Sequence, residues 1–258
     1  TCIKNAIKKT YGKKGDAVVQ SNCAAVDATL EHLHKLEAKA VVETSHKRVP
    51  LKLSGGSEFI QTVTKQLLEG KGDTLPVSAL PANGTWPTGT TCFEKRDLAQ
   101  AIPEWDPSIC IQCNRCAMVC PHAAIRSKHY DAKLLEKAPA DFKSVAFRSK
   151  EAENHAFTIQ VSPENCTGCN LCAEVCPAKN KADATQKALM MRKKADVFEA
   201  EKTRSDFFET LPWPDTVSTK LDAKATQFRQ PLFEYSGACA GCGETSYIKL
   251  LTQLFGDH

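Results

Sequence analysis

Apolar residues recur with helical spacing in four parts of the chain, and each part predicts a helix. Residues 3–11 carry an apolar side chain every fourth position and precede Gly12, which is typical of a helix that stops at a glycine. A second helix is predicted from about residue 16, with apolar positions that continue to residue 36. The other two predicted helices lie at 58–69 and 247–254.

The remaining pattern predicts strands and extended segments, so the expected fold class is α+β. Residues 157–161 alternate apolar and polar side chains as a strand does, whereas residues 188–191 fit either a short strand or a helical turn. Between 71 and 107 no helical period survives and five prolines interrupt the segment, which predicts an extended strap across another part of the protein. Prolines also predict a linker over 196–235.

The composition is that of a soluble globular protein with more than one folding unit. The chain has 258 residues, of which 42% are apolar and 25% are charged. No apolar run approaches the ~18 to 20 residues that cross a bilayer, so no membrane association is expected. A balance of 34 basic to 30 acidic residues, with scattered lysines, does not favour a nucleic-acid partner.

The cysteine content changes this general picture. Thirteen cysteines, clustered at short spacings without a secretory leader, favour metal ligation in a reducing, cytoplasmic compartment over a disulfide framework. The compartment would be an organelle in a eukaryote. The chain begins at Thr1 without an initiator methionine, and it stops at His258 directly after a predicted helix. We therefore expect an internal fragment of a larger protein.

Eight of the cysteines form two copies of one motif, C-x2-C-x2-C-x3-C-P. The second copy follows the first at an offset of 56 residues, which also aligns Asn114 with Asn170 and Ala117 with Ala173. The chain therefore contains an internal repeat. The first copy consists of Cys110, Cys113, Cys116, Cys120 and Pro121, and the second of Cys166, Cys169, Cys172, Cys176 and Pro177.

This spacing predicts two [4Fe-4S] clusters of the bacterial ferredoxin type. Three cysteines two residues apart can wrap one corner of a cubane, and the fourth thiolate must come from elsewhere. In two-cluster ferredoxins the fourth cysteine of each motif ligates the other cluster. We therefore assign Cys110, Cys113, Cys116 and Cys176 to cluster A, and Cys166, Cys169, Cys172 and Cys120 to cluster B.

Other uses of these cysteines fit the spacing less well. A zinc ribbon binds one zinc ion tetrahedrally with two C-x2-C pairs. Two copies of three closely spaced cysteines, each followed by a Cys-Pro, do not match that pattern well. The lone cysteines Cys2, Cys23 and Cys92 are predicted to be small buried hydrophobes. Cys239 and Cys242 form a further C-x2-C pair in a glycine-rich turn before the last helix. Taken alone, this pair is a metal half-site, a redox dithiol or half a zinc knuckle.

Three blocks around the motif resemble the pyruvate:ferredoxin (flavodoxin) oxidoreductases, also called pyruvate synthases. They are PTGTTCFEKR at 87–96, IPEWDP at 102–107 and SGACAGCGET at 236–245. The similarity covers nearly the whole chain, and a free-standing ferredoxin would lack these blocks.

The resemblance implies a homodimeric, thiamine-diphosphate-dependent enzyme with Mg²⁺ that converts pyruvate and coenzyme A to acetyl-CoA and CO2. Electrons would pass through three [4Fe-4S] clusters to ferredoxin or flavodoxin. By this resemblance Cys239 and Cys242 are two of the four ligands of the third cluster, nearest thiamine, and the other two would lie beyond His258. The fragment alone would then not be catalytically competent.

The resemblance also implies a division into domains. Its parts would be the end of the coenzyme-A-associated domain at 1–48, a short domain named for its Glu-Lys-Arg triplet at 49–102, a dicluster ferredoxin-like domain at 103–195, a linker at 196–235, and the start of the thiamine-diphosphate-binding domain at 236–258.

No side chain stands out as a catalytic acid or base, which fits chemistry carried by a cofactor. Arg115, Arg126 and Lys128 are candidates for steering an acidic ferredoxin, although ordinary solvated charges are the commoner alternative. Two other functions stay open: a dicluster ferredoxin adaptor that serves another oxidoreductase, and the NADP-linked relative of the pyruvate enzyme.

Overall fold

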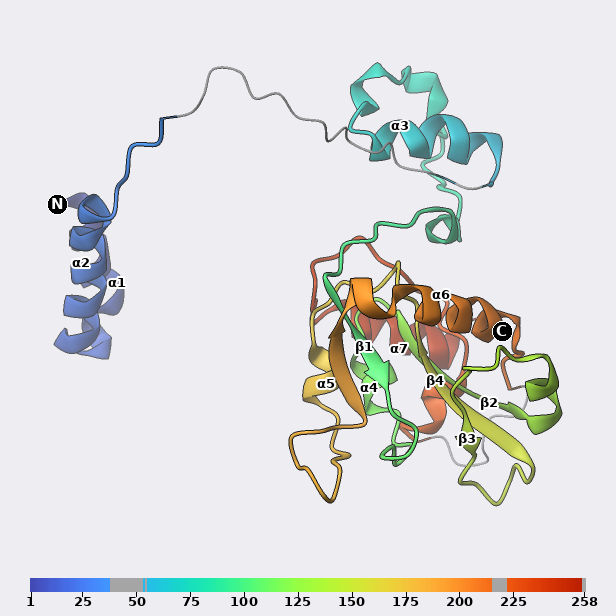
Figure 1. The fold of residues 1–258 in the computed structure, drawn as a ribbon. Helices are drawn as coiled ribbons and strands as arrows, with labels where there is room; N and C mark the ends of the chain where they lie inside the picture. Colours follow the sequence, from blue (N-terminus) through green and yellow to red (C-terminus); the bar gives the residue numbers. More distant parts are fainter. Residues whose placement is uncertain (38–52, 54, 215–221, 257–258) are drawn as a thin grey trace. The chain divides into compact units, whose positions relative to one another are not determined.

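The computed structural model describes residues 1–37, 53, 55–214 and 222–256, and the chain divides into two compact units, residues 1–49 and 50–258 (Figure 1). The predicted boundary between residues 48 and 49 lies outside the described residues. Among the described residues, no helix is long and apolar enough to cross a membrane.

The first unit is a pair of helices, as its apolar pattern predicts. Helix α1 spans Cys2–Tyr11, a short 3-10 turn (η1) spans Gly12–Lys14, and α2 spans Asp16–Glu31. Gly15 joins them with a φ of 103°, a left-handed conformation that glycine adopts without a steric cost. The prediction was wrong in one respect, because α2 ends at Glu31 and does not continue to Leu36.

The second unit starts with helical turns and an extended strap. A π-helical turn (η2) spans Ile60–Thr64 and α3 spans Lys65–Leu68, in agreement with the helix predicted there. Short 3-10 turns follow at Gly72–Thr74 (η3), Val77–Ala79 (η4) and Thr90–Phe93 (η5). The strap prediction missed β1 at Ala101–Trp105, which pairs antiparallel with β5 at Leu189–Lys193. Residues 188–191 were left open between strand and helix, and this pairing shows that 189–191 belong to a strand.

The two cysteine motifs each end in a short helix beside this two-stranded sheet. Helix α4 spans Arg115–Val119 in the first copy, and α5 spans Leu171–Glu174 in the second. Between them the chain forms a second sheet with strand order β2-β4-β3, in which β2 is Ile125–Asp131, β3 is Val145–Ala146 and β4 is His155–Val161. A 3-10 turn (η6) at Ala132–Lys137 follows β2. The strand predicted at 157–161 is therefore confirmed.

The core of the second unit joins this inserted sheet to the cysteine loops. Trp105 and Phe157 meet edge to face with ring centroids 6.0 Å apart, and Phe228 packs on Phe157 from a third segment. Four of the motif cysteines, Cys110, Cys116, Cys120 and Cys172, belong to the same buried cluster. The cysteine loops are therefore part of the hydrophobic core.

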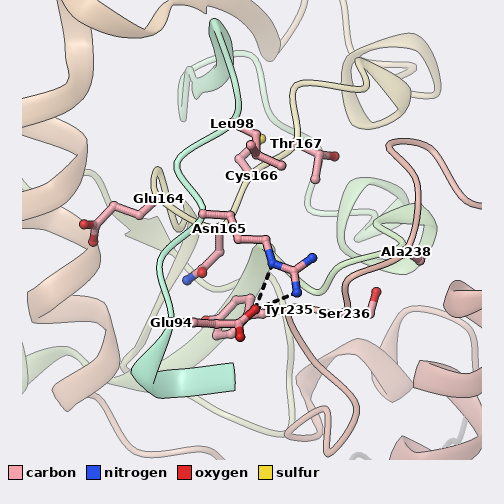
Figure 2. Close-up of a pocket in the computed structure, with 10 residues that line it drawn as sticks. Glu94, Leu98, Glu164, Asn165, Cys166, Thr167, Tyr235, Ser236 and Ala238 are labelled. Atoms are coloured by element: carbon pink, nitrogen blue, oxygen red, sulfur yellow. Dashed lines mark hydrogen bonds and ion pairs between the residues drawn. The ribbon is translucent and has the colours of Figure 1, made fainter. Parts of the chain in front are cut away.

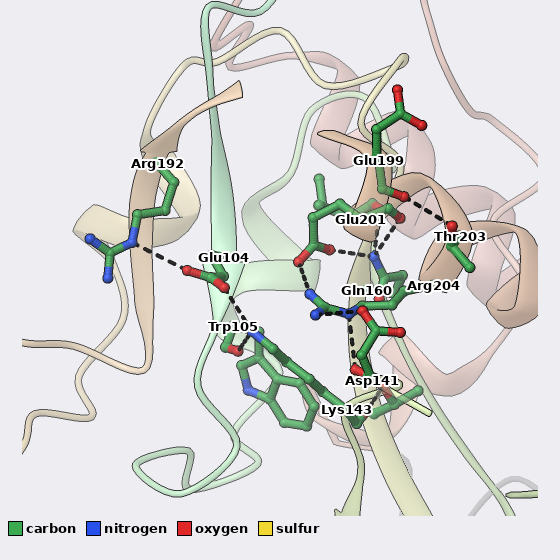
Figure 3. A network of polar contacts seen from close by, with 12 residues as sticks. Glu104, Trp105, Asp141, Lys143, Gln160, Arg192, Glu199, Glu201, Thr203 and Arg204 are labelled. Atoms are coloured by element: carbon green, nitrogen blue, oxygen red, sulfur yellow. Dashed lines mark hydrogen bonds and ion pairs between the residues drawn. The ribbon is translucent and has the colours of Figure 1, made fainter. Parts of the chain in front are cut away.

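Helix α6, Lys194–Thr210, falls where the sequence predicted a linker. Its buried face is polar, so its apolar periodicity is weak: Glu201 and Arg204 form an ion pair of 2.7 Å, and Gln160 of β4 donates to Glu201 at 2.6 Å (Figure 3). Arg204 also pairs with Asp141 at 2.8 Å. Buried charges that satisfy one another replace the apolar stripe that sequence analysis relies on.

The last segment returns to the cysteine loops. A 3-10 turn (η7) spans Ala225–Phe228, and α7 spans Thr245–Phe255, which confirms the final predicted helix. The turn that carries Cys239 and Cys242 directly precedes α7.

Candidate metal centre

The two cysteine loops have the same backbone conformation. Gln112 and Gly168 are related by the 56-residue repeat and have φ values of 58° and 71°. Asn114 and Asn170 are related in the same way, with φ values of 58° and 67°, and they begin α4 and α5. Left-handed residues at the same two places turn each loop around its three closely spaced cysteines.

Each of two cavities is lined by three cysteines of one motif copy and the fourth cysteine of the other. The first cavity, of about 300 Å³, is lined by Cys110, Cys113, Cys116 and Cys176. The second, of about 360 Å³, is lined by Cys120, Cys166, Cys169 and Cys172. The remaining side chains around them are mostly apolar, among them Trp105 and Leu189 in the first and Ile125 and Met191 in the second.

Backbone N–H groups point at several of these sulfurs. Gln112 donates to the Cys110 sulfur at 3.3 Å and Gly168 donates to the Cys166 sulfur at 3.4 Å, so the repeat also conserves this contact between its two halves. Ala124 donates to the Cys120 sulfur at 3.3 Å. Hydrogen bonds to ligand sulfurs stabilise the added electron of a reduced cluster and so tune its potential.

Burial raises the pKa of the thiols of Cys110, Cys116 and Cys172, and that of Cys166 to about 12. Neighbouring thiols raise these values further, because like charges repel: Cys176 acts on Cys110, and Cys120 acts on Cys166. Four thiolates brought together in an apolar cavity need a positive group among them. An iron–sulfur core fits this donor set, since it is held by four thiolates.

Neither a disulfide nor a site for a single metal ion is found among the described residues. All thirteen lie in the described residues, and none forms a disulfide. Within the part of the chain that the structure describes, no three His, Cys, Asp or Glu side chains converge closely enough to hold one metal ion. A zinc ion draws four donors to within about 2.3 Å of one point, whereas a cubane spreads its thiolates over four irons.

The lone cysteines were predicted to be buried, and for two of them the prediction was wrong. Cys2 and Cys92 are exposed, and Cys23 is half-buried. The Cys92 thiol, in the 3-10 turn η5, donates to the carbonyl of Gly89, the residue before that turn, at 3.0 Å.

The Cys239–Cys242 turn rests against the second cysteine loop. A Cβ placed on Gly241 would lie 3.5 Å from the Cβ of Cys169, an ordinary van der Waals distance, so the turn lies directly beside that side chain. Backbone N–H groups of Thr245 and Glu244, at the start of α7, lower the pKa of the Cys242 thiol. The pair is therefore adjacent to the second cavity, and the thiol of Cys242 ionises more readily than that of an ordinary cysteine.

The Glu-Lys-Arg triplet holds this turn in place, a role that the sequence did not reveal. Glu94 and Arg96 form an ion pair of 2.6 Å, and a Cβ on Gly237 would lie 2.7 Å from Nη1 of Arg96. The Lys95 ammonium lies 5.6 Å from the centre of the Tyr235 ring. Glu94, Arg96 and Tyr235 line one cavity of about 370 Å³ together with Cys166 of the second cysteine loop and Ala238 of the turn (Figure 2).

Two of the three proposed steering residues are not on the surface. Arg126 is buried and ion-paired to Glu234, and Lys128 is buried with its ammonium on the carbonyls of Phe208 and Leu211. Arg115 alone of the three is exposed, and it borders the first cavity. Arg126 and Lys128 therefore hold the fold together instead of steering a partner.

Comparison with known proteins defines the class of this protein first. Residues 109–180 match the 4Fe-4S dicluster domain, and residues 45–99 match a domain of unknown function called EKR. The chain is thus an α+β iron–sulfur protein with a dicluster domain.

Longer proteins of known name then show what the whole chain is similar to. The chain is 52% identical to pyruvate-flavodoxin oxidoreductase of Nostoc sp. over 265 residues, 99% of this chain and 22% of that protein. It is 47% identical to pyruvate:ferredoxin oxidoreductase of Moorella thermoacetica over 255 residues, 99% of this chain and 21% of that protein. It is also 40% identical to mitochondrial pyruvate dehydrogenase [NADP(+)] of Euglena gracilis over 261 residues, 99% of this chain and 14% of that protein.

The chain corresponds to one segment of the pyruvate-flavodoxin and pyruvate:ferredoxin oxidoreductases. It spans about a fifth of the length of the Nostoc and Moorella relatives.

Proposed function

We propose that this chain holds two [4Fe-4S] clusters in crossed cysteine sets and acts as the electron-transfer segment of a pyruvate:ferredoxin (flavodoxin) oxidoreductase. The observation that carries the proposal is the pair of cavities, each lined by three cysteines of one motif copy and one of the other. Cluster A would be held by Cys110, Cys113, Cys116 and Cys176, and cluster B by Cys166, Cys169, Cys172 and Cys120.

The chain's own residues provide what such clusters need. Cubane clusters, when bound, accept and release single electrons. The apolar walls limit water at the sulfurs, and the N–H groups of Gln112, Gly168 and Ala124 offer hydrogen bonds to them. Crossed ligation keeps the two sites adjacent, so that an electron can pass from one to the other.

The surroundings of the two sites support a direction of transfer. The turn with Cys239 and Cys242 touches the second loop at Cys169, so an electron from a third cluster held partly by this turn would enter at cluster B. Ile111 and Arg115 are exposed at the rim of the first cavity. Cluster A would therefore pass electrons to ferredoxin or flavodoxin.

In this proposal the whole enzyme is a cytoplasmic homodimer that uses thiamine diphosphate and Mg²⁺ to convert pyruvate and coenzyme A to acetyl-CoA and CO2. The names of the Nostoc and Moorella relatives support flavodoxin or ferredoxin as the acceptor. The lower identity to the Euglena protein makes an NADP-linked enzyme the less favoured alternative.

Iron and sulfide analysis with low-temperature EPR tests the cluster sites. We expect about eight irons per chain from two clusters, and a reduced spectrum with magnetic coupling between the two centres. A colourless protein with about one zinc per chain would disprove the sites.

An activity assay on the enzyme that contains this segment tests the rest. Pyruvate should drive the reduction of a dye only when coenzyme A is present. A dicluster adaptor of another oxidoreductase would contain the same clusters but show no pyruvate-dependent reduction.

A further inference from the structure

Lys249 is a buried lysine whose neighbours are backbone carbonyls of the first cysteine loop. It lies on α7 with 2% of its surface exposed. Its Nζ atom donates to the carbonyl of Ala117, to that of Met118 at 3.0 Å and to that of Cys120 at 3.2 Å. It thereby satisfies carbonyls at the end of α4 that have no partner within the helix.

The geometry requires the charged form of this side chain. Three carbonyl acceptors use all three N–H donors of an ammonium, whereas a neutral amine has one donor fewer. Among the described residues, Lys249 forms no ion pair with a carboxylate. The other cation at its cavity is Arg126, which is itself paired with Glu234.

An unpaired buried charge is costly unless something nearby compensates it. The carbonyls that Lys249 binds belong to residues 117, 118 and 120, which follow Cys116 of the first cavity and end at Cys120 of the second. A cluster held by four thiolates carries a net negative charge, because the thiolates outweigh the iron–sulfur core. The clusters would therefore be the counter-charge of this lysine.

We propose that Lys249 is a positioning residue that places a fixed positive charge beside both clusters, raises their reduction potential, and ties α7 to the first cysteine loop. Reduction adds an electron to a cluster, and a nearby cation in a poorly screened interior stabilises the reduced form. The proposal rests on the proposed cluster sites and not on the pyruvate activity.

Lys128 provides a matched control. It too is buried and binds two carbonyls, those of Phe208 at 3.0 Å and Leu211 at 2.5 Å, at the end of a helix. Its ammonium also lies 4.5 Å from the centre of the Trp213 ring. It lines neither cysteine cavity, and its hydrogen bonds go to carbonyls outside the cysteine loops, so it has the structural role of Lys249 without the electrostatic one.

The test is an EPR-monitored redox titration of the cluster-loaded protein with Lys249→Met, Lys249→Gln, Lys249→Arg and, as control, Lys128→Met. In the Met and Gln variants of Lys249 we expect the ratio of reduced to oxidised cluster at a fixed potential to fall about tenfold, a shift of about 59 mV for one electron. Lys249→Arg should stay near the wild type, and Lys128→Met should lose stability without a shift.

Each outcome decides the proposal. Unchanged potentials in Lys249→Met and Lys249→Gln, with clusters present, would overturn it. If these two variants load no iron while Lys249→Arg loads normally, the charge itself is required and the proposal stands. If Lys249→Arg also loads none, only packing at this site matters and the proposal fails. Absence of clusters from the wild type would instead refute the proposed function.

Discussion

The two cysteine loops, 110–120 and 166–176, share their backbone turns but differ in their neighbours. The first loop is hydrogen-bonded to the inserted sheet and the segment after it: the Gln112 side chain donates to the Ala146 carbonyl at 2.8 Å and accepts from the Arg148 N–H at 2.9 Å. The second loop has Gly168 at that position, packed under the Ala101 carbonyl of β1, and it faces the Cys239–Cys242 turn.

This difference separates what the motif requires from what the surrounding protein adds. A left-handed residue is needed at the same place in both loops, and glycine meets that need without strain. Gln112 adopts the strained conformation, and its two hydrogen bonds to the inserted sheet offset the cost. The first loop is therefore fixed by the side-chain hydrogen bonds of Gln112. The second loop instead depends on the close approach of Gly168 to the backbone of β1.

The largest expected effect comes from removing a cysteine that one loop donates to the cluster of the other loop. Cys176→Ala should remove the cluster of the first cavity, and Cys120→Ala that of the second, so each variant should lose about half of the iron. The remaining EPR signal would identify the surviving centre in each case. Cys92→Ala, at an exposed cysteine outside both cavities, should keep all of its iron. Loss of the second cluster from Cys176→Ala would show that each motif ligates its own cluster.

The next effect concerns the inserted sheet beside the first loop. His129 stacks on Phe147 with ring centroids 4.4 Å apart and lies 3.0 Å, nitrogen to nitrogen, from His155. Burial, with the charges of His155 and Lys224, lowers the pKa of His129 to about 4. Below pH 6.5 the unfolded chain therefore takes up a proton that the folded chain does not, and stability falls as the pH drops from about 6.5 to about 4.

His129→Phe keeps the stacked ring and should remove up to about 3 kcal/mol of this acid sensitivity. Urea denaturation between pH 7 and pH 4 measures it, as the slope of stability against pH. His34→Phe, at an exposed histidine, should leave the slope unchanged. Equal slopes in the wild type and His129→Phe would show that His129 is not held neutral.

A smaller effect tests the close approach in the second loop. In Gly168→Ala the new Cβ would meet the Ala101 carbonyl at 3.1 Å, at a φ of 71°. We expect a loss of about 2 kcal/mol. Gly84 has a φ of 72° and no atom within 4 Å of a built Cβ, so Gly84→Ala should cost only about 1 kcal/mol. The urea midpoint for loss of cluster absorbance should therefore fall further in Gly168→Ala than in Gly84→Ala. Equal midpoints would show that the contact with Ala101 does not destabilise the variant.

The smallest effect probes the turn that faces the second loop. Gly237→Ala should clash with the Arg96 guanidinium and destabilise the protein by about 1 kcal/mol, whereas Gly243→Ala has free space. Combining Gly237→Ala with Arg96→Ala should relieve the clash, so the two changes should not be additive. Additive losses in urea denaturation would mean that Arg96 does not hold the turn.

Spacing and period were enough to predict the repeat and the regular elements. The 56-residue offset, the strand at 157–161 and the helices near both ends follow from local pattern alone, because each depends on residues close together in the sequence. Helix α6 was missed since its buried face is an ion-pair network, and β1 was missed since Pro103 and the nearby prolines suggest a strap.

The sequence by itself determined which eight cysteines belong to the repeat and predicted that each cluster takes three thiolates from one loop and one from the other. The tertiary structure decided what surrounds them: the polar helix, the Glu-Lys-Arg clamp on Gly237, and the ammonium of Lys249 on the first loop. The physical reason is distance along the chain. A motif is defined by neighbours a few residues apart, whereas the carbonyls that Lys249 binds lie far from it along the chain, that of Met118 at a separation of 131 residues.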